Sequence, residues 1–365
     1  MTLHSNGIPQ QRSQQPAAGP GPGHPAPAGG PVRPAMESGR AGAGVPTGEM
    51  AMPPSLPDDD YAARAAAAGR AGDPGPAIGI LGGMGPEATV DLFAKIVRAT
   101  PARVDQDHVR IVIDNNPKIP DRTAYLRGEG PDPVPAMVAA IRGLAALGAS
   151  LILIPCNTAH VYFDRLQAES PVPILHIMRE VARALAAGRI PAPAGATGPG
   201  VPAAIPGPGN GVPSPWAETR VAGGAAAMAN GLPGAGPELP LPAGGPVGLL
   251  ATELTVQSGL YHRALAEVGL EVLVPEPEYQ ALVTRAIFGA DGIKAGVYEP
   301  ARQRLLAAGR HLVERGARVL IAGCTELPLV LRPGDFGVPW VDPAEILARA
   351  ALARVLAAPA PATRG

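Results

Sequence analysis

The same order of strands and helices occurs in both halves of the chain, and this repeat limits the possible folds more than any other feature of the sequence. Short apolar runs bounded by turn residues predict strands in the first half at 77–81, 110–113, 150–154 and 173–176. The second half predicts strands at 247–250, 271–274, 318–322 and 338–341, again with helical patterns between them. Alternating strands and helices are typical of parallel sheets with helices on both faces. We therefore predict an α/β fold of two similar doubly wound domains, each with a parallel four-stranded sheet.

The helices of the first half have clear sequence signals. Residues 86–99 are amphipathic, and Pro86 stands at a first-turn position that tolerates proline. Residues 134–148 place apolar side chains at helical spacing and end at Gly148, and 177–188 predict a closing helix.

Glycine and proline mark the domain boundaries. The chain has 47 Gly and 46 Pro, and they are concentrated at 1–76 and 190–245, where large apolar residues are few. Such segments bury too little apolar surface to offset the entropy lost on ordering. We expect a disordered tail at 1–76, a first domain at 77–189, a disordered insertion at 190–245 and a second domain at 246–357. A short tail follows at 358–365, and the last helix of the second domain is a candidate to pack on the first.

Charge and hydropathy exclude several classes of partner. The formal net charge is −1, which gives no electrostatic footprint for nucleic acid. No apolar run reaches the roughly 18 residues of a membrane span. The N-terminal residues lack the layout of a secretory signal, so we expect a cytoplasmic protein without nucleic-acid or membrane partners.

The two cysteines of the chain occupy equivalent places in the two halves. Cys156 follows the third strand of the first half in SLILIPCNT, and Cys324 follows the third strand of the second half in RVLIAGCTE. Ligands of open α/β sheets bind at the carboxyl ends of the strands. We therefore expect an active site in the cleft between the domains, with one thiol on each side. A cytosolic setting argues against a structural disulfide.

Two facing thiols suit racemisation. In that reaction one group removes the proton from Cα and a second returns a proton to the opposite face, and the two roles exchange with direction. The helix patterns that follow both cysteines are expected to favour the thiolate. Two other interpretations stay open: free cysteines are often buried core residues, and a redox pair is conceivable although no CxxC spacing is present.

At these residues the chain resembles the aspartate/glutamate racemase family, most closely its aspartate racemase branch. The resemblance covers nearly all of 77–357 outside the insertion. It implies a pseudo-symmetric two-domain fold, two-base cysteine catalysis without pyridoxal phosphate or metal, an amino-acid substrate and a homodimer. The motifs that carry it are GILGGMGPEAT (79–89), DNNPKIPDRT (114–123), PCNTAH (155–160), SGLY (258–261), IKAG (293–296) and GCTELP (323–328).

The resemblance also implies roles for individual residues. Cys156 and Cys324 match the family's catalytic pair. Arg122 and Lys294 match the basic residues that the family associates with the distal carboxylate of the substrate. A guanidinium fork reads a carboxylate well. The remaining substrate-binding positions are Met84 and Gly85 beside the substrate, and Asn157, Thr158 and Thr325 at its α-carboxylate and α-amino groups.

One motif departs from the family pattern. The family often has a turn resembling ATTGT after the first strand of the second domain, where this chain has ATELT (251–255). Glu253 and Leu254 add a charge and a Cβ where glycine permits unusual backbone angles. Glutamate or a broader set of amino acids therefore stays open as substrate, beside aspartate.

Two interpretations from other classes remain. The segment 83–88 fits G-x-G-x-x-A between a strand and a helix, which is typical of a dinucleotide-binding oxidoreductase. That interpretation leaves both cysteines unexplained. A non-catalytic amino-acid-binding protein is the second. His160 lies one helical turn beyond Cys156, as an orienting neighbour or a packed side chain, and the two alone are an incomplete metal-ligand set.

Overall fold

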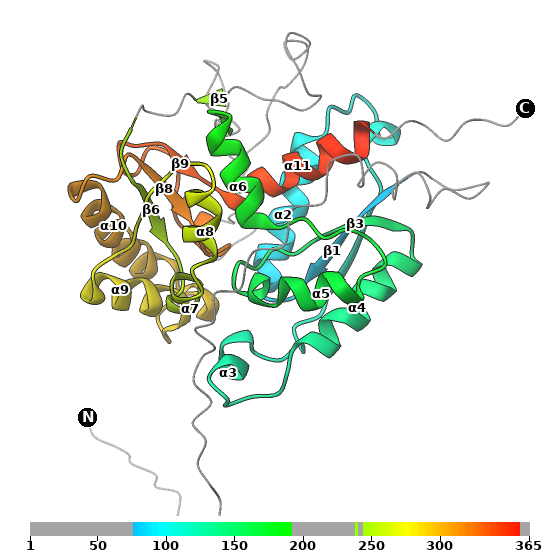
Figure 1. Cartoon of the computed structure of the whole chain (residues 1–365), viewed down its shortest axis with the longest axis horizontal. Helices are drawn as coiled ribbons and strands as arrows, with labels where there is room; N and C mark the ends of the chain where they lie inside the picture. Colours follow the sequence, from blue (N-terminus) through cyan, green and yellow to red (C-terminus); the bar gives the residue numbers. More distant parts are fainter. Residues whose placement is uncertain (1–75, 192–237, 240–243, 358–365) are drawn as a thin grey trace, which may run out of the picture. The chain divides into compact units, whose positions relative to one another are not determined.

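The computed structural model describes residues 76–191, 238–239 and 244–357 (Figure 1). The tail expected at 1–76, except for Pro76, lies outside the described residues. So do most of the insertion expected at 190–245 and the tail at 358–365.

The first half holds a parallel sheet of three strands in the order β2-β1-β3. Its strands are β1 (Ala77–Gly82), β2 (Ile111–Asn115) and β3 (Ala149–Leu153). The fourth strand predicted at 173–176 is reduced to a single parallel bridge between Ile152 and Ile174. The physical reason is local: Pro171 and Pro173 have no N–H to donate to a ladder, and α6 already begins at Ile177.

The helices of the first half begin where the sequence provides a start signal. The N-cap of α2 is Gly85 with proline in the first turn, as predicted, and Asp121 caps α3 by accepting from the backbone N–H groups of Thr123 and Ala124. The helices are α2 (Pro86–Ala99), α3 (Arg122–Leu126), α4 (Val134–Ala146), α5 (Phe163–Glu169) and α6 (Ile177–Ala186), with 3₁₀ turns η1 (Asp105–Asp107) and η2 (Thr158–Tyr162).

The second half holds a parallel sheet of four strands, as predicted, and their order is β7-β6-β8-β9. Its strands are β6 (Val247–Leu250), β7 (Val272–Leu273), β8 (Val319–Ala322) and β9 (Trp340–Val341). The helices are α7 (Glu253–Gln257), α8 (Leu260–Ala266), α9 (Pro277–Phe288), α10 (Tyr298–Glu314) and α11 (Pro343–Ala357), with turns η3 (Ile293–Ala295) and η4 (Leu327–Leu329). A short antiparallel pair, β4 (Ile190–Pro191) and β5 (Glu238–Leu239), lies between the halves in sequence.

Helix α11 packs on the first half although it ends the second. It lies beside α2 and α6 (Figure 1). Lys95 of α2 forms a buried ion pair with Asp342, just before α11, at 2.8 Å, and Arg354 of α11 pairs with Glu180 of α6 at 3.0 Å. One buried apolar cluster accordingly contains residues of both sheets.

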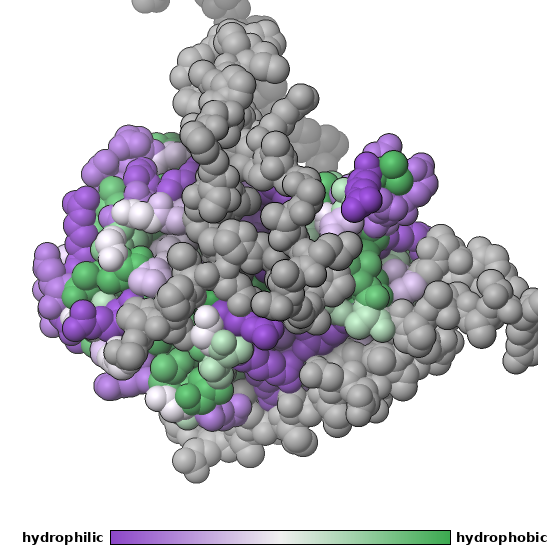
Figure 2. Space-filling model, turned by 90° about the horizontal axis from the view of Figure 1, so that it is seen from above, coloured by the Kyte–Doolittle hydropathy of each residue, from purple (hydrophilic) through white to green (hydrophobic). Residues whose placement is uncertain are grey.

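The described surface carries hydrophilic and hydrophobic groups side by side (Figure 2). Along α2, Val90, Phe93 and Val97 follow helical spacing and are 47%, 40% and 37% exposed. Within the described ranges, no helix combines the length and the apolar character that crossing a membrane requires.

Candidate active site

The two cysteines lie just beyond the ends of corresponding strands. Cys156 comes three residues after β3 and Cys324 two residues after β8, and each is only 7% exposed. The turn before Cys324 requires Gly323, because a Cβ there would lie 2.6 Å from Leu249 Cδ1 and 2.7 Å from Ala251 Cβ. Both thiols thus lie at the carboxyl ends of parallel strands, and the turn before Cys324 is tightly packed.

Cys324 lies in a chain of polar contacts. Its Sγ donates to Oε2 of Glu326 at 2.9 Å, and Oε1 of the same carboxylate pairs with Lys294 Nζ at 2.6 Å. The Glu326 side chain is almost fully buried, whereas a third of the Lys294 side chain is exposed. The ion pair therefore connects the buried thiol to the surface.

Gly85 brings the first half against this ion pair. A Cβ at Gly85 would lie 3.2 Å from Glu326 Oε1 and 3.4 Å from Lys294 Nζ. The loop after β1 therefore closes over the second half's charged groups, and a larger residue would press on them. Met84, the preceding residue, is buried in the same apolar cluster as Cys156.

Charged groups from both halves act on Cys156. Burial raises the pKa of its thiol above the ordinary value of 9.0, Arg122 and Lys294 lower it, and Glu326 raises it further. Arg122 is the first residue of α3, and its Nη1 donates to the carbonyls of Pro120 at 2.8 Å and Ile119 at 3.2 Å. These bonds hold the guanidinium beside the short helix that Asp121 caps.

Burial is the largest influence on both thiol pKa values, and it raises them. The pKa of Cys324 is raised well above 9.0, first by burial and then by the neighbouring Glu326 carboxylate. Backbone N–H groups in the turns after the cysteines, those of Ala159 and Glu326, lower the two pKa values, which is the direction predicted for a helix N-terminus, but burial outweighs them. Short 3₁₀ turns, η2 and η4, follow the cysteines, and one turn aligns few peptide dipoles.

The polar residues next to the cysteines bridge the two halves. Asn157 Oδ1 accepts from Tyr261 Oη at 2.8 Å, and Thr325 Oγ1 donates to the Pro155 carbonyl at 3.1 Å. The Thr158 hydroxyl lies 3.3 Å from Thr252 Oγ1 and 3.1 Å from Thr255 Oγ1. Asn157 is 3% exposed, and its Nδ2 has no hydrogen-bond partner among the residues that the structure describes.

Four residues at this site were not assigned to it from the sequence: Tyr261, Thr252, Thr255 and Glu326. Their motifs SGLY, ATELT and GCTELP gave the available signal. Within ATELT, Thr252 caps α7 by accepting from the Thr255 N–H, so Glu253 falls in the first turn of that helix. The departure from glycine is therefore accommodated as a helix start.

His160 and His176 are packed side chains. His160 Nδ1 donates to the Cys156 carbonyl at 2.9 Å and Nε2 accepts from the Ile177 N–H at 3.3 Å, which suits a neutral ring, and burial lowers its pKa. Its ring centroid lies 5.2 Å from that of His176. Across the described ranges, no group of three or more His, Cys, Asp or Glu residues has the arrangement of a metal site.

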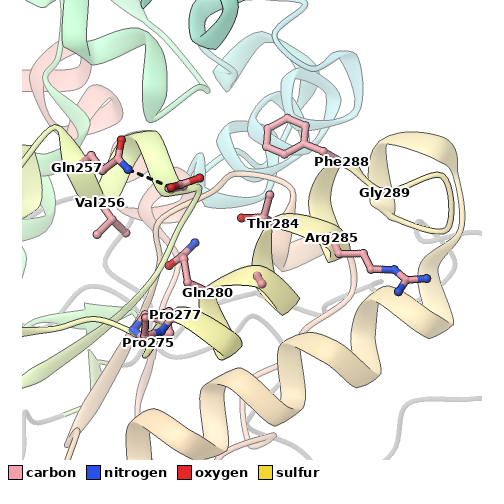
Figure 3. A pocket seen from close by; sticks show the side chains of 11 residues that line it. Val256, Gln257, Pro275, Pro277, Gln280, Thr284, Arg285, Phe288 and Gly289 are labelled. Atoms are coloured by element: carbon pink, nitrogen blue, oxygen red, sulfur yellow. Dashed lines mark hydrogen bonds between the residues drawn. The ribbon is translucent and has the colours of Figure 1, made fainter. Parts of the chain in front are cut away.

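A separate groove lies between α7 and α9 (Figure 3). Its volume is about 740 Å³, and Glu253, Gln280 and Phe288 are among the residues that line it. Gln280 Nε2 donates to the Ala251 carbonyl at 3.0 Å, and Lys294 Nζ lies 5.9 Å from the Phe288 ring centroid. Two residues that line the groove, Gln280 and Phe288, therefore contact Ala251 and Lys294, which lie near Cys324.

The fold and this site define an α/β enzyme built from two related halves, with one buried thiol at the end of the third strand of each. The family model described as Asp/Glu/Hydantoin racemase matches residues 81–197 and 231–351. The chain belongs to this family, and it is accordingly an amino-acid racemase of the family, an isomerase by reaction class.

Known proteins of similar sequence and structure agree with this assignment. The broad specificity amino-acid racemase RacX of Bacillus subtilis is 25% identical over 77% of this chain and 98% of its own length. The Picrophilus torridus aspartate racemase is 26% identical, with a TM-score of 0.54 over 76% of this chain and 93% of that chain. A structure described as a putative Asp/Glu racemase from Yersinia pestis, 21% identical, shares the fold with a TM-score of 0.53 over 77% and 99% of the two chains.

Proposed function

We propose that this protein interconverts L- and D-aspartate without a cofactor, with Cys156 and Cys324 as its two acid/base groups. The observation that carries the proposal is the pair of buried thiols at corresponding strand ends, set among charged groups of both halves. The similarity to the Picrophilus torridus aspartate racemase supports the choice of substrate.

The chemistry needs one thiolate and one thiol. The thiolate removes the Cα proton of the bound amino acid and becomes a thiol, while the opposite thiol protonates the other face of Cα and becomes a thiolate. The reverse reaction uses the same two groups with exchanged roles. The hydrogen bond from Cys324 Sγ to Glu326 Oε2 supports a protonated Cys324, so Cys156 is the first base in this scheme.

Substrate binding follows from the surrounding donors. The unpartnered Asn157 Nδ2 and the hydroxyls of Thr158 and Thr325 are suited to the α-carboxylate and α-amino groups. Arg122 and Lys294 bring positive charge for the distal carboxylate, and Met84 and Gly85 form the wall beside it.

A racemase of broader specificity is the second candidate. The positive charge of Lys294 is balanced by its ion pair with Glu326, which weakens its attraction for a distal carboxylate. Glu253 adds a negative charge at the groove between α7 and α9, 3.9 Å from Arg127. The similarity to RacX supports this candidate.

The deciding experiment follows deuterium exchange at Cα by proton NMR, with chiral chromatography of the same samples. L- and D-aspartate are incubated separately in D₂O, beside glutamate and neutral amino acids. Exchange with inversion of aspartate from both sides, without added cofactor, is expected. Faster inversion of glutamate or of neutral amino acids would move the assignment to the second candidate. Absence of exchange from a folded, reduced sample would contradict both.

Replacing Glu326 with glutamine is expected to shift the pH profile of kcat/KM toward lower pH. The reaction needs a thiolate, and burial raises both thiol pKa values, so kcat/KM of the wild type should rise into the alkaline range. The Glu326 carboxylate raises both pKa values, and removing its charge lowers them, so the thiolate forms at lower pH. Glu169→Gln, at an exposed surface pair with Arg142, is the matched control. An unchanged profile in Glu326→Gln would refute the electrostatic role.

Replacing Arg122 tests whether this residue binds the distal carboxylate of the substrate. In Arg122→Ala the KM for aspartate should rise about ten- to hundredfold, the range for a lost hydrogen bond to a charged group, and that for neutral amino acids much less. The profile should also move to higher pH, since Arg122 lowers the pKa of Cys156. Arg127→Ala, at the exposed end of the same helix, is the control. Equal losses for acidic and neutral substrates would contradict this role.

A homodimer is also part of the proposal. The exposed apolar stripe of Val90, Phe93 and Val97 on α2 supports it, because such a stripe is suited to burial against a second copy. Light scattering should give twice the chain mass, and a monomer at micromolar concentration would contradict it.

A further inference from the structure

Tyr261 is a fully buried side chain that crosses from the second half to the first. Gly259 begins the approach to α8 in the left-handed region, with φ of 66°, which favours glycine. This turn places Tyr261 in the first turn of α8, where its hydroxyl reaches Asn157 Oδ1 at 2.8 Å. The two residues are 104 positions apart in sequence.

The phenol acts as a donor in this hydrogen bond. Burial raises the pKa of Tyr261 well above 10.0, and the nearby Asp342 and Cys324 add to the effect, so the hydroxyl keeps its proton. An amide oxygen only accepts, so a donating phenol selects one of the two orientations of the Asn157 amide. The opposite end of the amide then presents Nδ2.

Nδ2 of Asn157 is a buried donor that needs an acceptor. Within the described part of the chain it has none, although its side chain is almost completely buried next to Cys156. Buried polar groups are nearly always hydrogen-bonded, so an unpartnered one calls for an explanation. A carboxylate of the bound substrate is an acceptor of the right chemistry at this place.

We propose that Tyr261 is a positioning residue, which fixes the Asn157 amide so that Nδ2 donates to a carboxylate of the bound amino acid. This inference rests on the proposed function, because Asn157 binds substrate there. Tyr261 itself acts only through Asn157. Without this hydroxyl, no hydrogen bond from Tyr261 selects one orientation of the amide, and the flipped amide would place its oxygen toward the substrate carboxylate.

The test compares steady-state kinetics of Tyr261→Phe with those of Tyr298→Phe. Each substitution removes one phenolic hydroxyl that makes a 2.8 Å hydrogen bond, but Tyr298 bonds to the exposed Glu87. Tyr261→Phe should raise the KM for aspartate about three- to tenfold and leave kcat within about twofold, since a binding contact is weakened equally in the ground and transition states. Tyr298→Phe should leave both parameters within about twofold. An unchanged KM, or a loss confined to kcat, in folded Tyr261→Phe would overturn the proposal.

A second measurement reads the amide directly. The ¹⁵N side-chain signals of Asn157, assigned through Asn157→Asp, should shift between ligand-free wild type and Tyr261→Phe; identical signals would overturn the proposal. This readout needs no turnover, so it separates failure of the positioning role from failure of the racemase assignment. If Tyr261→Phe does not fold, aspartate is titrated into the wild type instead. Asn157 signals that stay unmoved in a protein that racemises aspartate would overturn the proposal equally.

Discussion

Cys156→Ala and Cys324→Ala are each expected to abolish inversion of aspartate in both directions. Every turnover needs a base on one face of Cα and an acid on the other, so one remaining thiol cannot complete it. General acid–base groups contribute about a hundred- to ten-thousandfold each, and we expect the rate of inversion to fall by at least about a thousandfold. Chiral chromatography from either enantiomer measures this loss.

Exchange without inversion distinguishes the two variants. The thiol that remains still reaches one face of Cα, so each variant should exchange the Cα proton of one enantiomer with deuterium, and the two variants should differ in which enantiomer they exchange. Cys→Ser variants, which nearly keep the side-chain volume, control for packing at these buried positions. Interconversion at near wild-type rate in any of these folded variants would rule out the two-thiol scheme.

Lys95→Met should lower the free energy of unfolding by about 3–5 kcal/mol, the usual effect of removing one partner from a buried ion pair. The Lys95 side chain is 8% exposed and pairs with Asp91 and Asp342. The substitution leaves the carboxylates of Asp91 and Asp342, which are only 13% and 15% exposed, without their shared cation. Asp342 also caps α11, as its Oδ1 accepts from the Ala344 N–H at 2.9 Å. Urea denaturation at pH 7 measures the change, with the exposed Lys118→Met as control.

The pH dependence of this effect has a definite sign. Burial lowers the pKa of Lys95, but the Asp342 and Asp91 carboxylates together outweigh it and raise the pKa above 10.5. The contribution of Lys95 is therefore fully present below pH 10.5 and is lost as pH rises through the raised value. In Lys95→Met the carboxylates are no longer neutralised, and acid that protonates them should reduce the difference from wild type. A loss under about 1 kcal/mol at pH 7 would show that the network contributes little.

Local signals explain which elements were predictable. Residues 86–99 and 247–250 were placed with the correct bounds, because proline in the first turn and a short apolar run are local signals. The strand predicted at 173–176 is wrong because its apolar pattern outweighed the effect of Pro171 and Pro173, which have no N–H to donate to a sheet. Element boundaries elsewhere moved by one to two residues, as at β2 and β7.

The site was only partly predictable for the same reason. The cysteines could be placed at strand ends from topology alone. The contacts of Tyr261 with Asn157, and of Thr158 with Thr252 and Thr255, join segments about a hundred residues apart, and no local pattern encodes them. The direction of the thiol pKa values depends on burial in the assembled molecule, so the sequence did not predict it.

The packing of α11 has a consequence for engineering. By sequence this helix closes the second half, but it packs on α2 and α6 of the first, and Arg354 and the preceding Asp342 form ion pairs with those two helices. The halves are therefore not exchangeable modules at the midpoint of the gene. A chimera that imports a second half with another substrate preference must keep 342–357 of the host, or replace the matching faces of α2 and α6 together with it.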